Sequence, residues 1–342
     1  MKLLDMTQPL VSVKMITYNH APFITEAIEG VLQQETTFPF ELVIGEDCST
    51  DGTREIVFDY QKKHPDIIRV IISDKNVGMK KNNLRTLKAG RGKYIAFCEG
   101  DDYWHHPGKL QKQVDYMESH SECGLVFTDY DIYLQRPNKV VRNVNCSYGI
   151  RSPMHLNVEQ IIEKVGTVVN TCTVMGRRKL IEQVIYGDPY LHQSEKFLMG
   201  DTQLFAELAL ISKVSYYPES LATYRIHDES ATRSRDPRKV QRFRKSAAEM
   251  KLYLCDKHRL PESIRRKVEL YWCNACLFLA FLERSATLAE EVRKKKTFTF
   301  KEWLLYYGAK NLMLNHILRL LALCRKLLRR AARVLKTFGS AR

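Results

Sequence analysis

Strand-like and helix-like segments alternate along the N-terminal third of the chain, and this alternation constrains the fold more than any other feature. Four apolar runs have the length and composition of strands: 10–16, 40–45, 69–72 and 94–97. Helix-like segments separate them: 24–32, 54–64 and 82–89. Repeated strand–helix units predict a mostly parallel central sheet with flanking helices, which is an α/β fold.

Polar residues follow each of these strands. The clusters are Thr17–Asn19, Glu46–Asp51, Asn76–Gly78 and Glu99–Asp102. Ligands of parallel sheets bind at the carboxyl ends of the strands, so we expect the clusters to meet in one binding site.

Three carboxylates stand within four residues directly after the run Tyr94–Phe97. Glu99, Asp101 and Asp102 repel one another and resist removal from water, so they need a cation or solvent. A hard divalent metal, bound together with a phosphate-bearing ligand, is one solution. The other is a solvated acidic turn that caps the next helix, and spacing alone does not separate the two.

Composition narrows the class of protein. With 342 residues, 44% of them hydrophobic, the chain can form a large domain plus an appendage or second domain. We expect no signal peptide and no transmembrane helix, because no sufficiently long apolar run occurs. Nine scattered cysteines then indicate free thiols in a reducing cytosol. Cys273 and Cys276 lie in an apolar helical run, which favours buried helix positions over a zinc or redox site.

The positive charge is concentrated at the C-terminal end. Of the net charge of +15, residues 291–342 carry +12, which argues against a nucleic-acid-binding main body. On one side of a helix, this tail has an apolar stripe, and basic residues lie on the opposite side. The residues of the stripe are Ile317, Leu321, Cys324, Leu328, Ala331 and Leu335. A basic amphipathic helix suits an anionic membrane surface. The alternative is a helix that packs on its own protein or on a partner.

The later segments continue the mixed pattern. Strands are predicted at 124–128 and 171–175, and Gly200–Phe205 opens a helix. Two further runs, 214–217 and 221–225, predict a terminal β pair. From about 236 to 290 the pattern is helical.

Taken in order, these motifs resemble those of the inverting glycosyltransferases of family 2, which have the GT-A nucleotide-sugar fold. The resemblance covers about 10–230. It depends on these segments: Val11–Val13 with Thr17–Asn19, Glu46–Thr53, Asn76–Gly78, Gly92–Asp102 and Gly200–Asp201. It implies a GT-A type α/β domain followed by a C-terminal helical region.

The resemblance also implies a donor site. Glu99–Asp102 matches the family's DxD-type motif, which implies that Asp102 binds Mg²⁺ or Mn²⁺ at the diphosphate and that Asp101 contacts the ribose or the metal. Asp47 matches the carboxylate that accepts from the nucleotide base, commonly uracil. The remaining implied donor-site residues at this edge are Thr17, Tyr18, Asn19 and Asn76.

Three residues nearer the C-terminus complete the implied site. Asp201 aligns with the catalytic base, which takes the acceptor proton during inversion; a helix N-cap is the alternative. Arg225 and His227 alternate along a strand-like segment, so both face one side. The resemblance implies that Arg225 contacts a phosphate and His227 the metal or a phosphate. A structural histidine is the alternative for His227.

Together these features predict a cytoplasmic, metal-dependent sugar transferase with a nucleotide-diphosphate sugar donor, foremost a UDP-sugar. The acceptor is expected to be a glycan or lipid-linked glycan of bacterial surface polysaccharide or glycolipid assembly, reached at the inner face of the plasma membrane. A nucleotide-binding protein or membrane adaptor without transferase activity is the alternative. The expected domains are a GT-A domain at 8–230 with a nucleotide-sugar half at 8–112 and an acceptor half at 113–230, a helical extension at 231–300 and a basic tail at 301–342.

Overall fold

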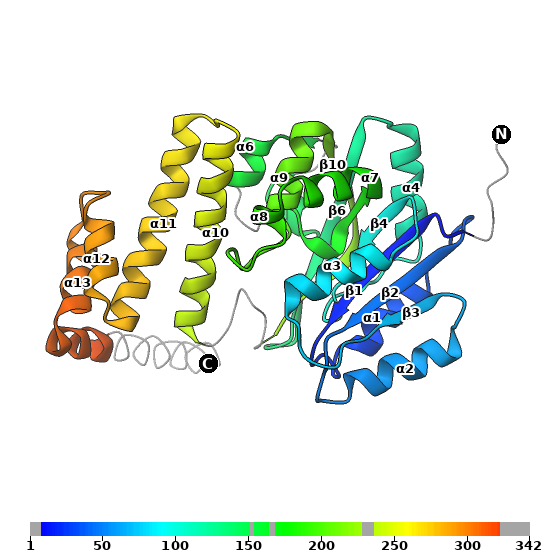
Figure 1. Cartoon of the computed structure of the whole chain (residues 1–342), viewed down its shortest axis with the longest axis horizontal. Helices are drawn as coiled ribbons and strands as arrows, with labels where there is room; N and C mark the ends of the chain where they lie inside the picture. The colour runs from blue at the N-terminus through cyan, green and yellow to red at the C-terminus, as the bar shows by residue number, and fades with distance from the viewer. Residues whose placement is uncertain (1–7, 151–153, 164–167, 228–235, 322–342) are drawn as a thin grey trace, which may run out of the picture. The chain divides into compact units, whose positions relative to one another are not determined.

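A ten-stranded sheet forms the centre of the N-terminal part of the molecule (Figure 1). The computed structural model describes residues 8–150, 154–163, 168–227 and 236–321. The chain divides into two compact units, 1–230 and 231–342. The strands of the first unit are β1 (Val11–Thr17), β2 (Phe40–Glu46), β3 (Ile68–Ile71), β4 (Tyr94–Phe97), β5 (Tyr103–Trp104), β6 (Cys123–Leu134), β7 (Lys139–Val141), β8 (His155–Leu156), β9 (Val174–Arg177) and β10 (Lys213–Ile226).

The sheet is mixed and mostly parallel. Its order is β3-β2-β1-β4-β9-β6-β10-β5, with β7 paired to β6 and β8 paired to β10. β1 runs parallel to both neighbours, with Val13 opposite Leu42 of β2 and Ala96 of β4. β9 is antiparallel to β4 and β6 and joins the first parallel group to the long parallel ladder of β6 with β10. The α/β prediction is confirmed.

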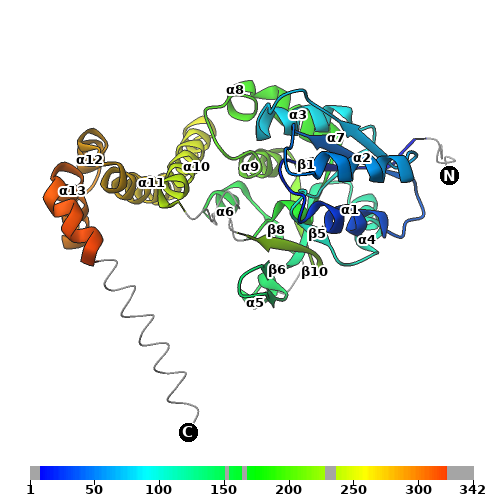
Figure 2. The ribbon, with the colours of Figure 1, turned by 90° about the horizontal axis from the view of Figure 1, so that it is seen from below.

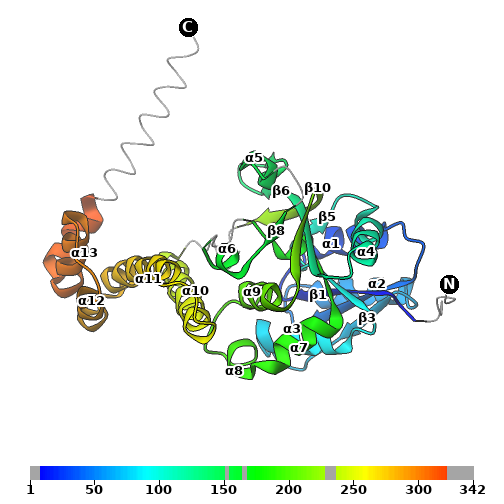
Figure 3. The same cartoon turned by 90° about the horizontal axis from the view of Figure 1, so that it is seen from above.

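Helices cover both faces of this sheet. The longer ones are α1 (Ile24–Leu32), α2 (Thr53–Lys63), α3 (Met79–Ala89), α4 (Lys109–Ser119), α7 (Arg178–Gly187) and α9 (Thr202–Ile211). The shorter ones are α5 (Val144–Ser147), α6 (Val158–Glu163), α8 (Pro189–His192) and the 3₁₀ helix η1 (Thr171–Thr173). In Figures 2 and 3, α1 and α4 lie on one face and α3 and α7 on the other.

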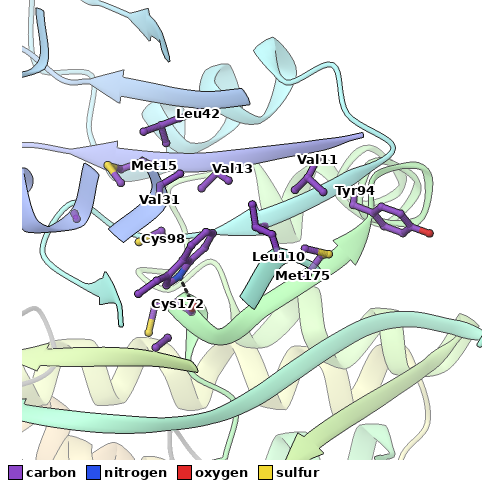
Figure 4. Close-up of a cluster of buried hydrophobic side chains, with 14 of the residues drawn as sticks. Val11, Val13, Met15, Val31, Leu42, Tyr94, Cys98, Leu110, Cys172 and Met175 are labelled. Atoms are coloured by element: carbon purple, nitrogen blue, oxygen red, sulfur yellow. Dashed lines mark hydrogen bonds between the residues drawn. The ribbon is translucent and has the colours of Figure 1, made fainter. Parts of the chain in front are cut away.

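The core beneath α1 and α4 uses alternate residues of β1. Val11, Val13 and Met15 are buried on this face with Val31 of α1 and Leu110 of α4 (Figure 4). The face opposite them carries Ser12, Lys14 and Ile16, because successive side chains of a strand point to opposite sides. One side of β1 therefore contributes apolar side chains to the core, and the opposite side of the same strand carries Lys14.

Trp104 of β5 is the largest fully buried side chain of this core. Its indole N–H donates to the carbonyl of Cys172 in η1 at 2.8 Å. Gly30 of α1 lies against the backbone of Trp104, where an added Cβ would come within 2.7 Å of the carbonyl oxygen. α1 and β5 thus approach more closely than any residue with a side chain would allow.

The predicted β pair near the end of this unit is wrong. Residues 214–217 and 221–225 belong to a single strand, β10, which runs along β6 with register shifts between Tyr217 and Ala222. Pro218 has no N–H to donate and interrupts the ladder without ending the strand, since β6 continues as a template. The strand predicted at 171–175 begins as η1 and becomes β9 only at Val174.

The second unit is helical, as predicted. It contains α10 (Pro237–Lys257), α11 (Glu262–Glu283), α12 (Ala286–Arg293) and α13 (Phe300–Lys310), followed by a helical segment at 312–321. Cys273 and Cys276 are free and buried in α11. Of the predicted apolar stripe, Ile317 and Leu321 are exposed; Cys324, Leu328, Ala331 and Leu335 lie outside the described residues. Within 8–321, none of the helices the structure describes has the length and hydropathy to cross a membrane.

Replacing Gly30 tests the close approach of α1 to β5. We expect Gly30→Ala to lower the free energy of unfolding by about 1–3 kcal/mol, because the new methyl group meets backbone atoms that cannot rotate away. Urea denaturation of the full chain measures this. Gly187→Ala is the matched control, since Gly187 is also helical and has open space around its Cβ position. A loss of stability no larger in Gly30→Ala than in the control would contradict this packing.

The buried Lys109 predicts how the stability of the fold depends on pH. Its ammonium group lies 4.1 Å from the centre of the Trp104 ring and 2.6 Å from Oε1 of Gln113, and burial lowers the pKa of Lys109 to about 7. Between about pH 10 and pH 7 the unfolded chain therefore binds a proton that the folded chain lacks, so this group lowers stability as the pH falls.

Lys109→Met removes this titration and keeps the apolar volume. We expect the stability of the variant, relative to the unmodified protein, to be more favourable at pH 7 than at pH 10. Urea denaturation at the two pH values measures the difference, and an unchanged difference would contradict the assigned pKa.

Candidate functional site

An acidic loop, Glu99–Asp102, connects β4 to β5 at the carboxyl ends of the parallel strands. The loop is fixed to β1 by the N–H of Gly100, which donates to the carbonyl of Ile16 at 3.1 Å. A Cβ on Gly100 would come within 2.9 Å of the Thr17 hydroxyl, so a larger residue here would force Thr17 and its neighbours to shift. The polar clusters after β1 and β4 therefore meet, as the sequence predicted.

The end of β10 closes over this loop. The backbone N–H of Arg225 donates to Oδ1 of Asp102 at 2.8 Å, and Nε2 of His227 lies 3.0 Å from Oδ2 of Asp101. Burial raises the pKa of Asp101, but the hydrogen bond with His227 and the charges of His20 and His227 together more than offset this, so the pKa of Asp101 is lowered overall. His227 and the acidic pair, distant in sequence, are thus brought together.

The other two carboxylates are harder to ionise. Burial raises the pKa of Asp102 well above its usual range, and the carboxylates of Asp101 and Glu99 raise it further. Burial also raises the pKa of Glu99 to about 7, with Lys14 lowering it and Asp101 and Asp201 raising it. Oε2 of Glu99 is buried without a hydrogen-bond partner among the described residues. A positive charge placed next to this loop would therefore stabilise its ionised carboxylates.

Lys14 is a site residue that sequence reasoning missed. It projects from β1, is 4% exposed, and its ammonium donates to Oδ1 of Asn83 in α3. Burial lowers the pKa of Lys14, while the nearby charges of Glu99 and Asp201 raise it. The available signal was a lysine within an otherwise apolar strand.

Asp201 stands at the start of α9. Its Oδ1 accepts the backbone N–H of Thr202 at 2.6 Å, and its Oδ2 accepts from the hydroxyl of Thr171 at 3.3 Å. The N-cap interpretation is therefore correct as far as the helix is concerned. The charge of Asp201 is also among the causes that raise the pKa of Glu99. Thr171 was not foreseen.

Asp47 organises the loop that follows β3. Its two carboxylate oxygens accept the backbone N–H groups of Val77 and Gly78 at 2.9 and 3.0 Å, and Arg85 lies 3.8 Å from Oδ1. The side chain of Asn76 accepts from the same Gly78 N–H at 3.0 Å. The Asn76–Gly78 turn and the end of β2 are therefore held together through one buried carboxylate.

Residues 17–19, at the end of β1 and just after it, lie next to Asp47 at the same edge of the sheet. The Thr17 carbonyl accepts the N–H of Asp47 at 3.1 Å, and the Thr17 hydroxyl is buried with no hydrogen-bond partner in the described part of the chain. Tyr18 is 43% exposed. Asn19 has a left-handed backbone (φ 54°), and its side chain accepts from Thr50 at 2.9 Å. Asn19 thus shapes the loop, while Tyr18 offers an accessible ring.

The guanidinium of Arg225 is engaged inside the protein. Its Nε donates to the carbonyl of Asp101 at 2.8 Å, and it forms an ion pair with Glu26 of α1. Three aromatic rings surround it at 5.1–5.2 Å: Phe23, Tyr103 and Tyr133. Arg225 therefore holds the acidic loop in place, a role that the strand-like spacing did not reveal.

Comparison with known families and curated proteins gives consistent matches. The model described as glycosyl transferase family 2 matches residues 12–185. An uncharacterised protein of Mycobacterium bovis is 32% identical over 220 residues, which cover 63% of this chain and 58% of that protein. The chain thus spans a little over half the length of this relative. A Bacillus subtilis protein named as the teichuronic acid biosynthesis glycosyltransferase TuaG is 32% identical over 177 residues, 52% of this chain and 66% of the relative.

Solved structures show the same fold. Staphylococcus aureus TarS 1–349 in complex with UDP-GlcNAc has a TM-score of 0.53 at 20% identity, covering 87% of this chain and 86% of that one. The mannosyltransferase PcManGT from Pyrobaculum calidifontis, in complex with GDP-Man and Mn²⁺, has a TM-score of 0.53 at 15% identity, covering 91% and 86%. At these identities the likeness shows the fold alone, and it confirms the predicted GT-A type.

Asp47→Asn tests the role of the buried carboxylate after β2. The amide keeps one acceptor oxygen and turns an NH₂ group toward the N–H of Val77 or Gly78, so one of the two hydrogen bonds is lost and two donors face each other. We expect the free energy of unfolding to fall by about 1–3 kcal/mol in urea denaturation. Asp74→Asn is the control, because Asp74 is an exposed carboxylate in the neighbouring loop. Equal effects of the two substitutions would contradict the assignment.

Proposed function

The chain belongs to glycosyl transferase family 2, and we propose that it moves a sugar from a nucleotide-diphosphate donor to an acceptor hydroxyl with inversion at the anomeric carbon. One observation supports the proposal: His227 contacts Asp101 of the acidic loop from a distant part of the chain, and the charge of Asp201, from a third part, raises the pKa of Glu99 in the same loop. A solvated acidic turn would need neither partner. This reaction requires carboxylates that bind a divalent cation and a further carboxylate that accepts the proton of the acceptor hydroxyl.

The donor nucleotide would lie along the ends of β1 and β2. Asp47 uses one lone pair of each oxygen for backbone N–H groups, so it retains capacity to accept from the N–H of a base. Tyr18 provides an exposed ring for stacking, and Thr17, Asn19 and Asn76 complete this wall. TarS is named in complex with UDP-GlcNAc, which supports a UDP-sugar as the donor.

A divalent cation, Mg²⁺ or Mn²⁺, fits the acidic loop. Buried carboxylates with raised pKa values are the donor set that such an ion stabilises. Asp101, Asp102 and His227 would hold it, and it would counter the charge that develops on the departing diphosphate. Within 8–321, no three His, Cys, Asp or Glu side chains of the described residues converge in the geometry of a metal site.

Asp201 would act as the base. The acceptor oxygen attacks the anomeric carbon, the bond from that carbon to the diphosphate oxygen breaks, and the hydroxyl proton passes to Asp201. Thr171 and the N terminus of α9 hold the carboxylate in place. No protein nucleophile is needed, because a single displacement inverts the configuration. Arg225 would position the acidic loop through its hydrogen bond to the carbonyl of Asp101, next to the expected place of the donor's phosphates.

We place the reaction in surface glycan assembly. TuaG is named for teichuronic acid biosynthesis, which supports a glycan or lipid-linked glycan as acceptor. The acceptor half, 113–230, would shape this second site, and the protein would work in the cytoplasm at the inner face of the plasma membrane.

Asp201→Asn separates the base from the helix cap. Asparagine caps a helix about as well as aspartate but takes no proton at neutral pH. We expect the release of UDP from an accepted UDP-sugar, with Mn²⁺ and acceptor present, to slow about 10²–10⁴-fold while donor affinity stays nearly unchanged.

Asp188→Asn is the matched control, since Asp188 caps α8 through the N–H of Leu191 at 2.9 Å. It should retain the original rate. If transfer by Asp201→Asn equals that of the control, Asp201 is a cap only and the base lies elsewhere.

A further inference from the structure

The helical unit contains a cavity lined mainly by arginine. It has a volume of about 520 Å³ and lies between the start of α10, the end of α11 and the helical segment 312–321. Figure 1 shows α10 and α11 side by side within this unit. The lining residues are Arg238, Arg242, Leu282, Glu283, Arg284, Asn315, His316 and Arg319.

Most of the positive charge in this cavity is uncompensated. Among the described residues that line the cavity, Glu283 is the one acid, and it is paired with Arg242 at 2.6 Å. Across the described residues, the side chains of Arg238 and Arg284 have neither a hydrogen-bond nor an ion-pair partner. Arg319 donates to the carbonyl of Leu282 at 2.7 Å, but its buried Nε has no acceptor in the residues that the structure describes. Two guanidinium groups, those of Arg238 and Arg284, therefore have unused donors at this cavity, and Arg319 adds a third positive charge to its lining.

Guanidinium donors arranged in this way suit a phosphate group. A guanidinium presents a planar fork that matches phosphate oxygens, and several forks can share one phosphate. The dipole of α10 adds little, because Asp236 already caps that helix through the N–H of Arg238 at 2.9 Å. Recognition depends on the arginine side chains.

The segment that carries Arg319 also has an exposed apolar face. Its inner side is fixed by Asn315, whose amide donates to the carbonyls of Phe281 and Gly308 at 2.8 and 2.9 Å. The apolar side chains that face solvent are Leu312, Met313, Ile317, Leu320 and Leu321, between 45% and 75% exposed. Apolar side chains next to phosphate-binding cations are what a lipid bilayer surface requires.

We propose that this cavity binds the phosphate group of an anionic membrane lipid, with the apolar face of 312–321 entering the acyl boundary. The site lies outside residues 12–185, which match the family model, and it does not depend on sugar transfer. It would keep the protein at the membrane surface whether or not a donor is bound.

Vesicle binding by the full chain tests the proposal. Vesicles of phosphatidylcholine with phosphatidylglycerol are compared with phosphatidylcholine alone for the unmodified protein and for Arg238→Gln/Arg284→Gln. Neither side chain has a hydrogen-bond or ion-pair partner among the described residues, so the double variant should fold. We expect about 30-fold weaker binding to the anionic vesicles. Arg244→Gln/Arg266→Gln is the control, because it removes the same charge from exposed positions of α10 and α11 outside the cavity. Equal losses in the two variants would overturn the site.

A second arm distinguishes a lipid from a soluble phosphate ester. Leu320→Gln/Met313→Gln should weaken binding to the anionic vesicles while leaving the arginines in place. Glycerol 3-phosphate, tested by calorimetry, should bind the unmodified protein much more weakly than the vesicles do. Undiminished vesicle binding by this variant, or glycerol 3-phosphate binding as tight as vesicle binding, would overturn the lipid assignment.

Discussion

Three carboxylates at the end of one strand, Asp102 buried and Glu99 and Asp101 partly buried, set the main electrostatic constraint on the N-terminal unit. The end of β10 serves two of them, since Asp102 accepts the N–H of Arg225 and Asp101 contacts His227, while the charge of Lys14 on β1 lowers the pKa of Glu99. A buried charge without such a partner is strongly destabilising. The loop can therefore exist only where β1, β4 and β10 end together, and that requirement links the two halves of the sheet.

The long strand β10 meets this requirement. It runs beside β6 from Lys213 to Ile226 and absorbs Pro218 through register shifts instead of turning back. A β pair would have returned the chain before Arg225 reached the acidic loop. Arg225 then joins α1 to the loop, because its guanidinium pairs with Glu26 and donates to the carbonyl of Asp101. Its buried charge therefore fixes the position of the loop relative to α1. The aromatic rings of Phe23 and Tyr103 pack around the guanidinium of Arg225.

The two units differ in the charge that they present. The first gathers acids at one edge of the sheet, which suits a cation and the phosphates of a donor. The second gathers arginines in a cavity, which suits the phosphate of a lipid. A protein that combines both would work where a water-soluble donor meets an acceptor at a membrane, and each unit would carry one of the two tasks.

The sequence by itself determined the α/β class, the first four strands, the helical end of the chain and the polar clusters at the strand ends, because apolar periodicity and turn chemistry are local. It also marked Asp47, Asp101, Asp102, Asp201 and His227 as candidates. Only the tertiary structure decided the partners. That Arg225 faces inward, that Lys14 and Thr171 belong to the site, and that β10 is one strand depend on contacts between residues far apart in the chain. Spacing along a sequence does not encode such contacts, since they arise from which buried charges and backbone groups must find each other.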